Sequence, residues 1–235
     1  MLIKRFSSTM NEYVKRGLFI TFEGTDGVGK STQADLLAEA LRTRGYQVCL
    51  TREPGGSAAA EALRHLLLLG EVSFSLRSEI LVHFAARFDH VERVISPALQ
   101  EGQIVLCTRF SDSTIAYQGY GWGKGDQKIL SFIDTLNKHL ERQPDKTFLL
   151  KTSRQIAKQR LATRSIEQDY YECAEEAFHK RVIAGFEEIA LQQTERVCCI
   201  ETTNCPIHEV HDKILQEVLA VSAHFSNFSD VSSRG

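Results

Sequence analysis

An apolar strand pattern runs into a glycine-rich loop and then into a helical pattern between residues 19 and 41. Residues 19–22 are apolar, aromatic or β-branched, residues 24–31 carry the pattern Gly-x-x-x-x-Gly-Lys-Ser, and apolar residues recur at helical spacing over 34–41. A strand, a glycine-rich loop and a helix in this order are the context in which the pattern binds phosphate. An accidental glycine-rich turn is the alternative, and the flanking elements disfavour it.

The residues of this loop have the chemistry that phosphate binding requires. Gly24 and Gly29 let the backbone approach an anion closely, and the positive end of the following helix faces the same ligand. Lys30 adds a point charge, and the Ser31 hydroxyl is placed to ligate the magnesium ion that accompanies a nucleoside triphosphate. The loop therefore predicts a nucleoside triphosphate site with magnesium as its metal.

Length and composition indicate one globular domain. The chain has 235 residues, 43% of them hydrophobic, which is enough for one sizeable core and too few for two comfortable domains. A net charge of −2 gives no reason to expect nucleic acid or an anionic membrane as the main partner. Six cysteines without C-x-x-C spacing favour reduced thiols in a cytosolic protein over a zinc site or disulfides. No apolar run is long enough to span a membrane.

The periodic patterns predict a three-layer α/β/α domain with a five-stranded parallel sheet over residues 18–225. Residues 1–17 are predicted as a flexible N-terminal extension, with a transit peptide and a start at Met10 as alternatives, and residues 226–235 as a disordered tail. One long helix or two abutting helices are predicted over 78–100, with Pro97 breaking the pattern near the end. The glycines between 119 and 125 are expected to form a flexible connection. The predicted strands are 19–22, 47–51, 103–108, 146–151 and 196–201, and the other predicted helices are 34–44, 58–69, 126–141, 153–164, 171–193 and 207–225.

Polar side chains follow the predicted strands, where open parallel sheets bind their ligands. Arg52 follows the second strand and is a candidate phosphate ligand, with a solvated surface arginine as the alternative. The segment 109–119 after the third strand concentrates an arginine, hydroxyls, a tyrosine and an amide, which indicates a site. Arg87 lies on one helix face with His83 and His90, and is either an interface or a ligand arginine.

Four separate motifs, in order, resemble those of the thymidylate kinase family of P-loop nucleoside monophosphate kinases. The resemblance covers about residues 18–225. The motifs are Phe22-Glu23-Gly24-x-Asp26-Gly27-x-Gly29-Lys30-Ser31-Thr32; Thr51-Arg52-Glu53-Pro54-Gly55-Gly56; Phe84-Ala85-Ala86-Arg87 with His90-Val91 and Ile95-x-Pro97-Ala98-Leu99; and Ala116-Tyr117-Gln118-Gly119. The family implies a P-loop kinase fold with a short lid, here about residues 160–172, in a cytoplasmic homodimer. It also implies magnesium-dependent transfer of the ATP γ-phosphoryl group to dTMP, giving dTDP and ADP for dTTP synthesis.

The resemblance also implies roles for individual residues. Lys30, Arg109, Arg160 and Arg164 are the implied catalytic residues. The last two are lid arginines, and they are implied because Gly27 stands where some family members place a P-loop arginine. The implied ATP-binding residues are Gly24, Thr25, Asp26, Gly27, Val28, Gly29, Lys30, Ser31 and Thr32, with Ser31 as the metal ligand. The implied dTMP-binding residues are Asp26, Arg52, His83, Arg87, Arg109, Thr114, Tyr117 and Gln118.

Three positions depart from the family pattern. Thr108 replaces an aspartate that helps to hold magnesium, which is expected to lower metal affinity or to shift the duty to Glu23 or solvent. His83 stands at the aromatic position that stacks on thymine, so dTMP affinity is expected to be reduced and pH-dependent, and His83→Phe to bind dTMP more tightly. Tyr170 removes one expected lid cation. A kinase of another nucleotide, or a catalytically weakened nucleotide-binding relative, therefore remains an alternative.

Overall fold

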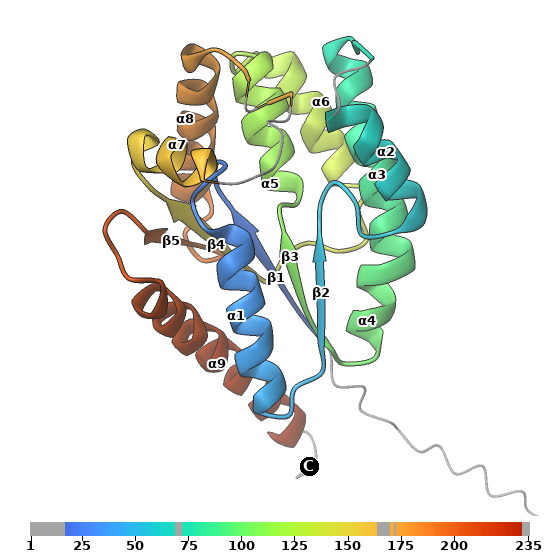
Figure 1. Ribbon diagram of the computed structural model, residues 1–235. Helices are drawn as coiled ribbons and strands as arrows, with labels where there is room; N and C mark the ends of the chain where they lie inside the picture. Colours follow the sequence, from blue (N-terminus) through green and yellow to red (C-terminus); the bar gives the residue numbers. More distant parts are fainter. Residues whose placement is uncertain (1–16, 69–71, 164–169, 172, 232–235) are drawn as a thin grey trace, which may run out of the picture.

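A sheet of five parallel strands forms the centre of the molecule, in the order β2-β3-β1-β4-β5 (Figure 1). The computed structural model describes residues 17–68, 72–163, 170–171 and 173–231. Each strand lies within one residue of its predicted position, which confirms the predicted parallel sheet. The strands are β1 (Leu18–Glu23), β2 (Val48–Arg52), β3 (Ile104–Thr108), β4 (Lys146–Lys151) and β5 (Val197–Glu201).

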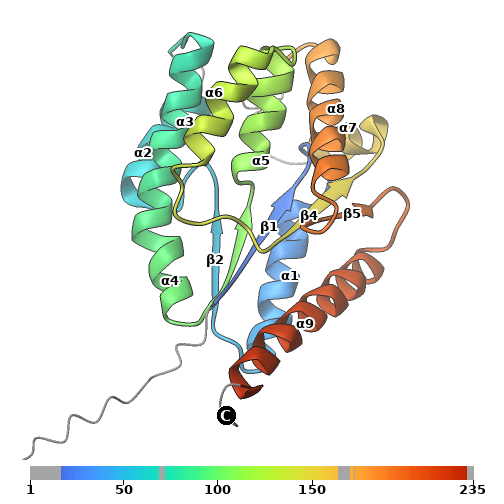
Figure 2. The same cartoon turned by 180° about the vertical axis from the view of Figure 1, so that it is seen from behind.

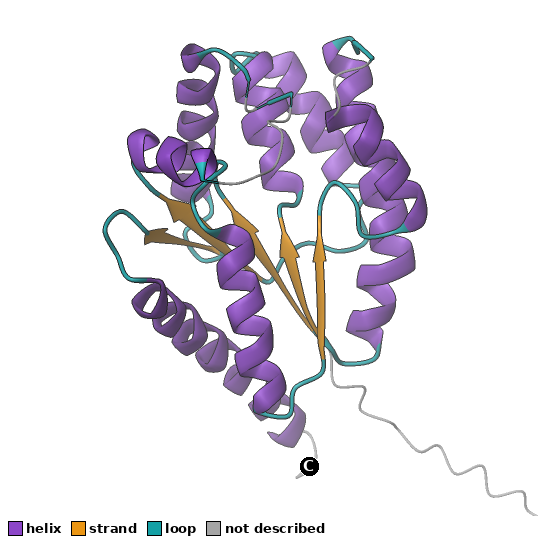
Figure 3. Cartoon of the chain, in the orientation of Figure 1, coloured by secondary structure: helices purple, strands orange, loops and turns teal. Residues whose placement is uncertain are grey.

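Helices cover both faces of the sheet and complete the predicted three layers (Figure 2; Figure 3). α1 and α9 cover one face, while α3, α6 and α8 pack on the other. The helices are α1 (Lys30–Thr43), α2 (Ala58–Leu68), α3 (Leu76–His90), the π-helix η1 (Val91–Ile95), α4 (Ser96–Gln100), α5 (Ser111–Thr114), the π-helix η2 (Ile115–Trp122), α6 (Gln127–Asn137), α7 (Arg154–Ala162), α8 (Glu176–Gln192) and α9 (Ile207–Val231).

The central strand β1 explains why the phosphate loop lies at the middle of the sheet edge. Every residue of β1 is buried, because strands pair on both sides and helices cover both faces. Ile20 and Phe22 pack toward α1 and α9, whereas Phe19 packs toward α3 and α6, as the twofold repeat of a strand requires. The loop after β1 therefore begins from a rigid, fully packed strand.

The segment after β3 is helical, and the prediction of a flexible glycine connection is wrong. Residues 111–122 form α5 and η2, and η2 packs closely against α8. A Cβ on Gly121 would lie 2.5 Å from the Phe178 ring, and one on Gly185 would lie 2.9 Å from Tyr120. These glycines allow two helices to approach closely, which depends on tertiary packing that the local sequence does not show.

Several helix boundaries also differ from the predictions: α1 begins at Lys30 rather than at residue 34, and α6 ends at Asn137 rather than at residue 141. Pro97 does not break the long helix, because the wider π-helical turn of η1 comes just before it and the helix continues through α4. α9 continues to Val231, past the predicted end at Phe225 and into the segment predicted as disordered, because that segment contains no glycine or proline before Val231. α8 begins at Glu176 rather than at Tyr171, whose side chain is buried among residues of the cavity described next. The predicted helix start at Ser153 is confirmed, since its hydroxyl accepts a hydrogen bond from the Ile156 N–H.

Candidate active site

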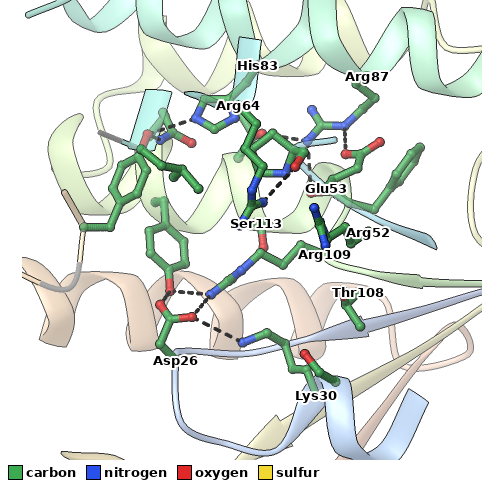
Figure 4. Close-up of a pocket in the computed structure, with 18 of the residues that line it drawn as sticks. Asp26, Lys30, Arg52, Glu53, Arg64, His83, Arg87, Thr108, Arg109 and Ser113 are labelled. Atoms are coloured by element: carbon green, nitrogen blue, oxygen red, sulfur yellow. Dashed lines mark hydrogen bonds and ion pairs between the residues drawn. The ribbon is translucent and has the colours of Figure 1, made fainter. Parts of the chain in front are cut away.

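A cavity of about 360 Å³ lies at the carboxyl ends of the strands, between the phosphate loop and helices α2, α3 and η2 (Figure 4). Most of the predicted site residues line it: Asp26, Gly27, Gly29, Lys30, Ser31, Arg52, His83, Arg87, Arg109, Thr114, Tyr117 and Gln118. The other predicted ATP-binding residues are not part of the lining: Gly24, Thr25 and Val28 of the same loop, and Thr32 in the first turn of α1. Arg160 does not line the cavity, and Arg164 lies outside the described residues.

The phosphate loop has the backbone conformation that its glycines allow. Gly24, Gly27 and Gly29 all have positive φ angles, which other residues rarely adopt. A Cβ on Gly27 would lie 2.6 Å from the Ala157 carbonyl oxygen of α7, so this position has no room for a side chain. Lys30 Nζ donates to the carbonyl oxygens of Gly24 and Thr25 at 3.0 and 2.7 Å. The lysine is thus held over the loop, where a bound phosphate would lie.

Asp26 and Arg109 form the ion pair at the centre of the cavity (Figure 4). Arg109 Nη2 lies 2.6 Å from Asp26 Oδ1, and the Tyr117 hydroxyl donates to Asp26 Oδ2 at 3.1 Å. Lys30 Nζ lies 3.7 Å from the same carboxylate. Burial disfavours the charge on Asp26, but Arg109 and Lys30 outweigh it and hold its pKa well below the usual value. Asp26 therefore stays ionised and joins both cations.

Glu23 helps to hold the Arg109 side chain in place through a hydrogen bond to Ser113. Arg109 Nη1 donates to Ser113 Oγ at 3.0 Å, and Ser113 Oγ donates to Glu23 Oε2 at 2.6 Å. Glu23 Oε1 also accepts from the backbone N–H of Phe110 at 2.7 Å. Arg109 itself has φ 69°, a strained conformation outside glycine. These contacts fix the arginine side chain, and they disfavour transfer of a metal-binding duty to Glu23 because both of its oxygens already have protein partners.

Arg87 extends from α3 into the opposite end of the cavity with one nitrogen unpaired. Its Nε donates to Glu53 Oε2 at 2.7 Å, and its Nη2 donates to the Phe110 carbonyl oxygen and to Thr114 Oγ1. Its Nη1 is buried and has no hydrogen-bond partner among the described residues. Glu53 Oε1 also lies 3.0 Å from His90 Nδ1. The arrangement leaves one charged donor for a ligand carbonyl oxygen.

His83 is buried and neutral, which corrects the expectation that its charge would make dTMP binding pH-dependent. Burial, with the nearby charges of Arg87 and Arg109, lowers the pKa of His83 to about 3. Its Nε2 lies 2.9 Å from the Tyr171 hydroxyl. Sequence patterns did not identify Tyr171, because its partners lie about 90 residues away along the chain.

The other arginines in or near the cavity contact acceptor groups of the protein. Arg52 is more than half exposed and pairs with Glu61 at 3.1 Å. Arg64, which the sequence patterns did not identify, lines the cavity and donates to the Pro54 carbonyl oxygen at 2.8 Å. The only sequence signal for Arg64 is a cation within the Ala- and Leu-rich helix α2. Arg160 in α7 contacts the phosphate loop from outside, with Nη1 3.4 Å from the Gly27 carbonyl oxygen.

A glycine-rich phosphate loop after the central strand, and a cation-lined cavity that continues from it to Arg87, define a P-loop kinase of a small phosphorylated substrate. The thymidylate kinase family model matches residues 22–214. The chain is 51% identical over 203 residues to a thymidylate kinase of Gluconobacter oxydans, covering 86% of this chain and 94% of the relative. It is 46% identical to one of Rhizorhabdus wittichii over 204 residues, covering 85% of this chain and 96% of the relative.

A crystal structure of thymidylate kinase from Ehrlichia chaffeensis has the same fold, with a TM-score of 0.70 and 36% identity. The match covers 87% of this chain and 99% of that one. The chain therefore belongs to the thymidylate kinase family, and it is a nucleotide-binding phosphotransferase of that family. None of the described helices combines the length and the hydropathy that a membrane span needs.

Proposed function

We propose that this cavity transfers the γ-phosphoryl group of ATP to dTMP, giving dTDP and ADP for dTTP synthesis. The observation that supports the proposal most strongly is that one continuous cavity is lined by Lys30 of the phosphate loop and by Arg87 at its far end. A triphosphate on the loop and a nucleoside monophosphate toward α3 would meet within it. Phosphoryl transfer needs mainly alignment of the two anions and neutralisation of the moving group.

The acceptor nucleotide is assigned to the side of the cavity away from the loop. Arg109 and Arg52 are proposed to bind the dTMP phosphate, because both are cations that line the cavity. Asp26 faces the sugar and keeps Arg109 in place through their 2.6 Å ion pair. Arg87 Nη1, the buried donor without a partner, is proposed to bind a carbonyl oxygen of the thymine. The remaining proposed contacts to the nucleoside come from Thr114, Tyr117 and Gln118.

ATP is assigned to the phosphate loop, with magnesium bound at Ser31. Ser31 is exposed at the start of α1 and lines the cavity. Groups of three or more acidic, histidine or cysteine side chains that would hold a metal are absent from the described residues. This fits magnesium, which in nucleotide sites takes most of its ligands from phosphates and water and only one or two from protein. Magnesium would neutralise phosphate charge during transfer.

Arg160 and Arg164 remain the proposed lid arginines that neutralise the transferred group. The tight contact of Gly27 with α7 supports this assignment. Position 27 has no room for an arginine of the phosphate loop, so the catalytic arginines would have to come from another segment. Arg160 already lies beside the phosphate loop, where the transferred group would be, since its Nη1 is 3.4 Å from the carbonyl oxygen of Gly27. Lys30 would bind the β- and γ-phosphates from the opposite side.

We also propose a cytoplasmic homodimer. All six cysteines are free thiols, which suits a reducing compartment. Leu66 in α2 and Leu81 in α3 are 44% and 48% exposed, and their helices pack side by side, which makes this surface a candidate for the contact between subunits. Analytical ultracentrifugation tests the dimer. A monomer at micromolar concentration would contradict it.

A coupled assay with ATP, magnesium and dTMP tests the reaction. The wild-type chain should turn over dTMP faster than dUMP, dCMP or dGMP, and Lys30→Ala should abolish most of the turnover. Highest activity on another monophosphate would favour a kinase of a different nucleotide. Wild-type turnover equal to that of Lys30→Ala would favour the catalytically weakened relative.

A further inference from the structure

Four buried side chains form a hydrogen-bonded cluster at the Arg87 end of the cavity: Glu79 and His83 from α3, Gln118 from η2, and Tyr171. The Tyr171 hydroxyl lies 2.8 Å from Glu79 Oε1 and 2.9 Å from His83 Nε2. Gln118 Nε2 donates to Glu79 Oε1 at 2.8 Å and to the Tyr171 oxygen at 3.2 Å. His83, Gln118 and Tyr171 also line the cavity. The dashed line from His83 in Figure 4 marks its bond to the tyrosine.

The number of hydrogens in this cluster determines where each proton lies. Both hydrogens of Gln118 Nε2 are directed at Glu79 and Tyr171, so this amide nitrogen donates to both groups and accepts from neither. A phenol has one hydrogen, and the Glu79 carboxylate accepts it. The Tyr171 oxygen can then only accept from His83, which must carry its proton on Nε2. Nδ1 of the neutral histidine is consequently a bare acceptor, and it has no protein partner among the described residues.

We propose that Glu79 and Tyr171 are positioning residues that fix the Nε2–H tautomer of His83, and that His83 Nδ1 is a specificity determinant for a pyrimidine with an imide N3–H. The inference rests on the proposed function, because it concerns the base of the acceptor nucleotide. Arg87, whose Nη1 is the unpaired donor, follows His83 by four residues on α3, so the two side chains project from the same face of the helix. A donor beside an acceptor complements a carbonyl oxygen beside N3–H, the edge of thymine and uracil.

Cytosine has the wrong pattern for this pair of groups. Its N3 carries a lone pair instead of a hydrogen, so it would face His83 Nδ1 acceptor to acceptor. A site that binds a polar group by hydrogen bonding rejects ligands that leave its own polar atoms unpaired. His83 would thus meet the edge of the base through Nδ1 instead of stacking on its face, and phenylalanine in its place would lose the discrimination rather than improve binding.

The tautomer is tested by ¹⁵N NMR of the histidine side chains, with His83→Asn used to assign the His83 signals. The wild-type spectrum at neutral pH should show His83 protonated on Nε2 and unprotonated on Nδ1. Tyr171→Phe should give a mixture of tautomers, because Nε2–H loses its acceptor. Tyr170→Phe is the matched control, since it keeps the ring that packs on Trp122 and Tyr171 and removes only a hydroxyl that makes no hydrogen bond to the four clustered side chains. A wild-type His83 protonated on Nδ1 would overturn the proposal without any mutant.

The specificity is tested by calorimetric titration of dTMP, dUMP and dCMP into the wild-type protein, His83→Phe, Tyr171→Phe and Tyr170→Phe. The ratio of the dCMP Kd to the dTMP Kd should fall about tenfold in His83→Phe, the size of one lost hydrogen bond. It should fall by less in Tyr171→Phe and stay unchanged in Tyr170→Phe. The dUMP-to-dTMP ratio should stay constant in all four proteins, because both bases carry N3–H.

An unchanged dCMP-to-dTMP ratio in His83→Phe, with dTMP bound as tightly or more tightly, would show that His83 only stacks, and it would overturn this inference alone. A wild-type protein that binds none of the three pyrimidine monophosphates would overturn the proposed function as well. Thermal unfolding of each variant, followed by circular dichroism, confirms that the compared proteins are folded.

Discussion

The buried carboxyl group of Glu23 should make a contribution to the stability of this protein that is lost as the pH rises. Burial, together with the charge of Asp112, raises the pKa of Glu23 from 4.5 to about 7, although Ser113 and Phe110 donate hydrogen bonds to it. In the unfolded chain the same group ionises near its ordinary pKa. Between pH 4.5 and 7 Glu23 therefore binds more protons in the folded state than in the unfolded state, so its contribution to stability is lost through this interval.

The loss is large because the difference in pKa is large. A rise from 4.5 to about 7, at about 1.4 kcal/mol for each pH unit, amounts to about 3 kcal/mol. Glu23→Gln removes the titration but keeps a carbonyl oxygen for the Phe110 N–H and an amide near Ser113. The variant should match the wild-type stability near pH 5 and exceed it by about 2 to 3 kcal/mol at pH 8.5.

Urea-induced unfolding, followed by circular dichroism at pH 5 and 8.5, measures this difference. Glu39→Gln is the matched control, because Glu39 is an exposed residue of α1 and its variant should follow the wild type at both pH values. The reasoning fails if Glu23→Gln is less stable than the wild type at pH 8.5. It also fails if the difference between the two proteins does not change with pH.

Three further outcomes are expected. Arg87→Ala should raise the KM for dTMP by about tenfold or more and leave the KM for ATP nearly unchanged, because Nη1 is the buried donor at the base end of the cavity; equal changes in steady-state kinetics would contradict its role. Lys30→Ala should lower kcat by about 100-fold or more in the coupled assay, and a smaller loss would place the charge elsewhere. Gly121→Ala should cost about 1 to 3 kcal/mol in urea unfolding, since its Cβ meets the Phe178 ring; an unchanged midpoint would show that α8 can move.

Features that local sequence determines could be predicted, and features that depend on distant contacts could not. The five strands and the phosphate loop follow from short periodic patterns, and each lies where it was predicted. The glycines of residues 119–123 suggested a flexible connection because glycine usually interrupts helices, but here they pack against α6 and α8. The π-helix η1 likewise allows Pro97 to lie within a continuous helix.

The same distinction applies to the candidate site. Lys30 and Arg87 could be selected because each lies in a recognisable motif, and Arg109 because it follows a predicted strand; the structure brings all three to one cavity. Glu79 and Tyr171 could not, because they are 92 residues apart and neither lies in a recognisable pattern. His83 shows the consequence: the residue type alone suggested a charged ring, whereas burial makes it neutral and Tyr171 gives it a hydrogen-bond partner.

The way in which the cations of the cavity are paired separates phosphate binding from base recognition. Lys30 donates to a backbone carbonyl oxygen of its own loop, while Arg52 forms an ion pair with Glu61 and Arg109 forms one with Asp26. A phosphate that arrives at these residues replaces or shares acceptors that already stabilise their charge, so the empty cavity does not force unpaired cations together. Arg87 differs, because its Nη1 is buried without a partner even though its Nε is paired. A neutral carbonyl oxygen is enough to satisfy that remaining donor, so Arg87 suits a base, whereas Lys30, Arg52 and Arg109 suit phosphates.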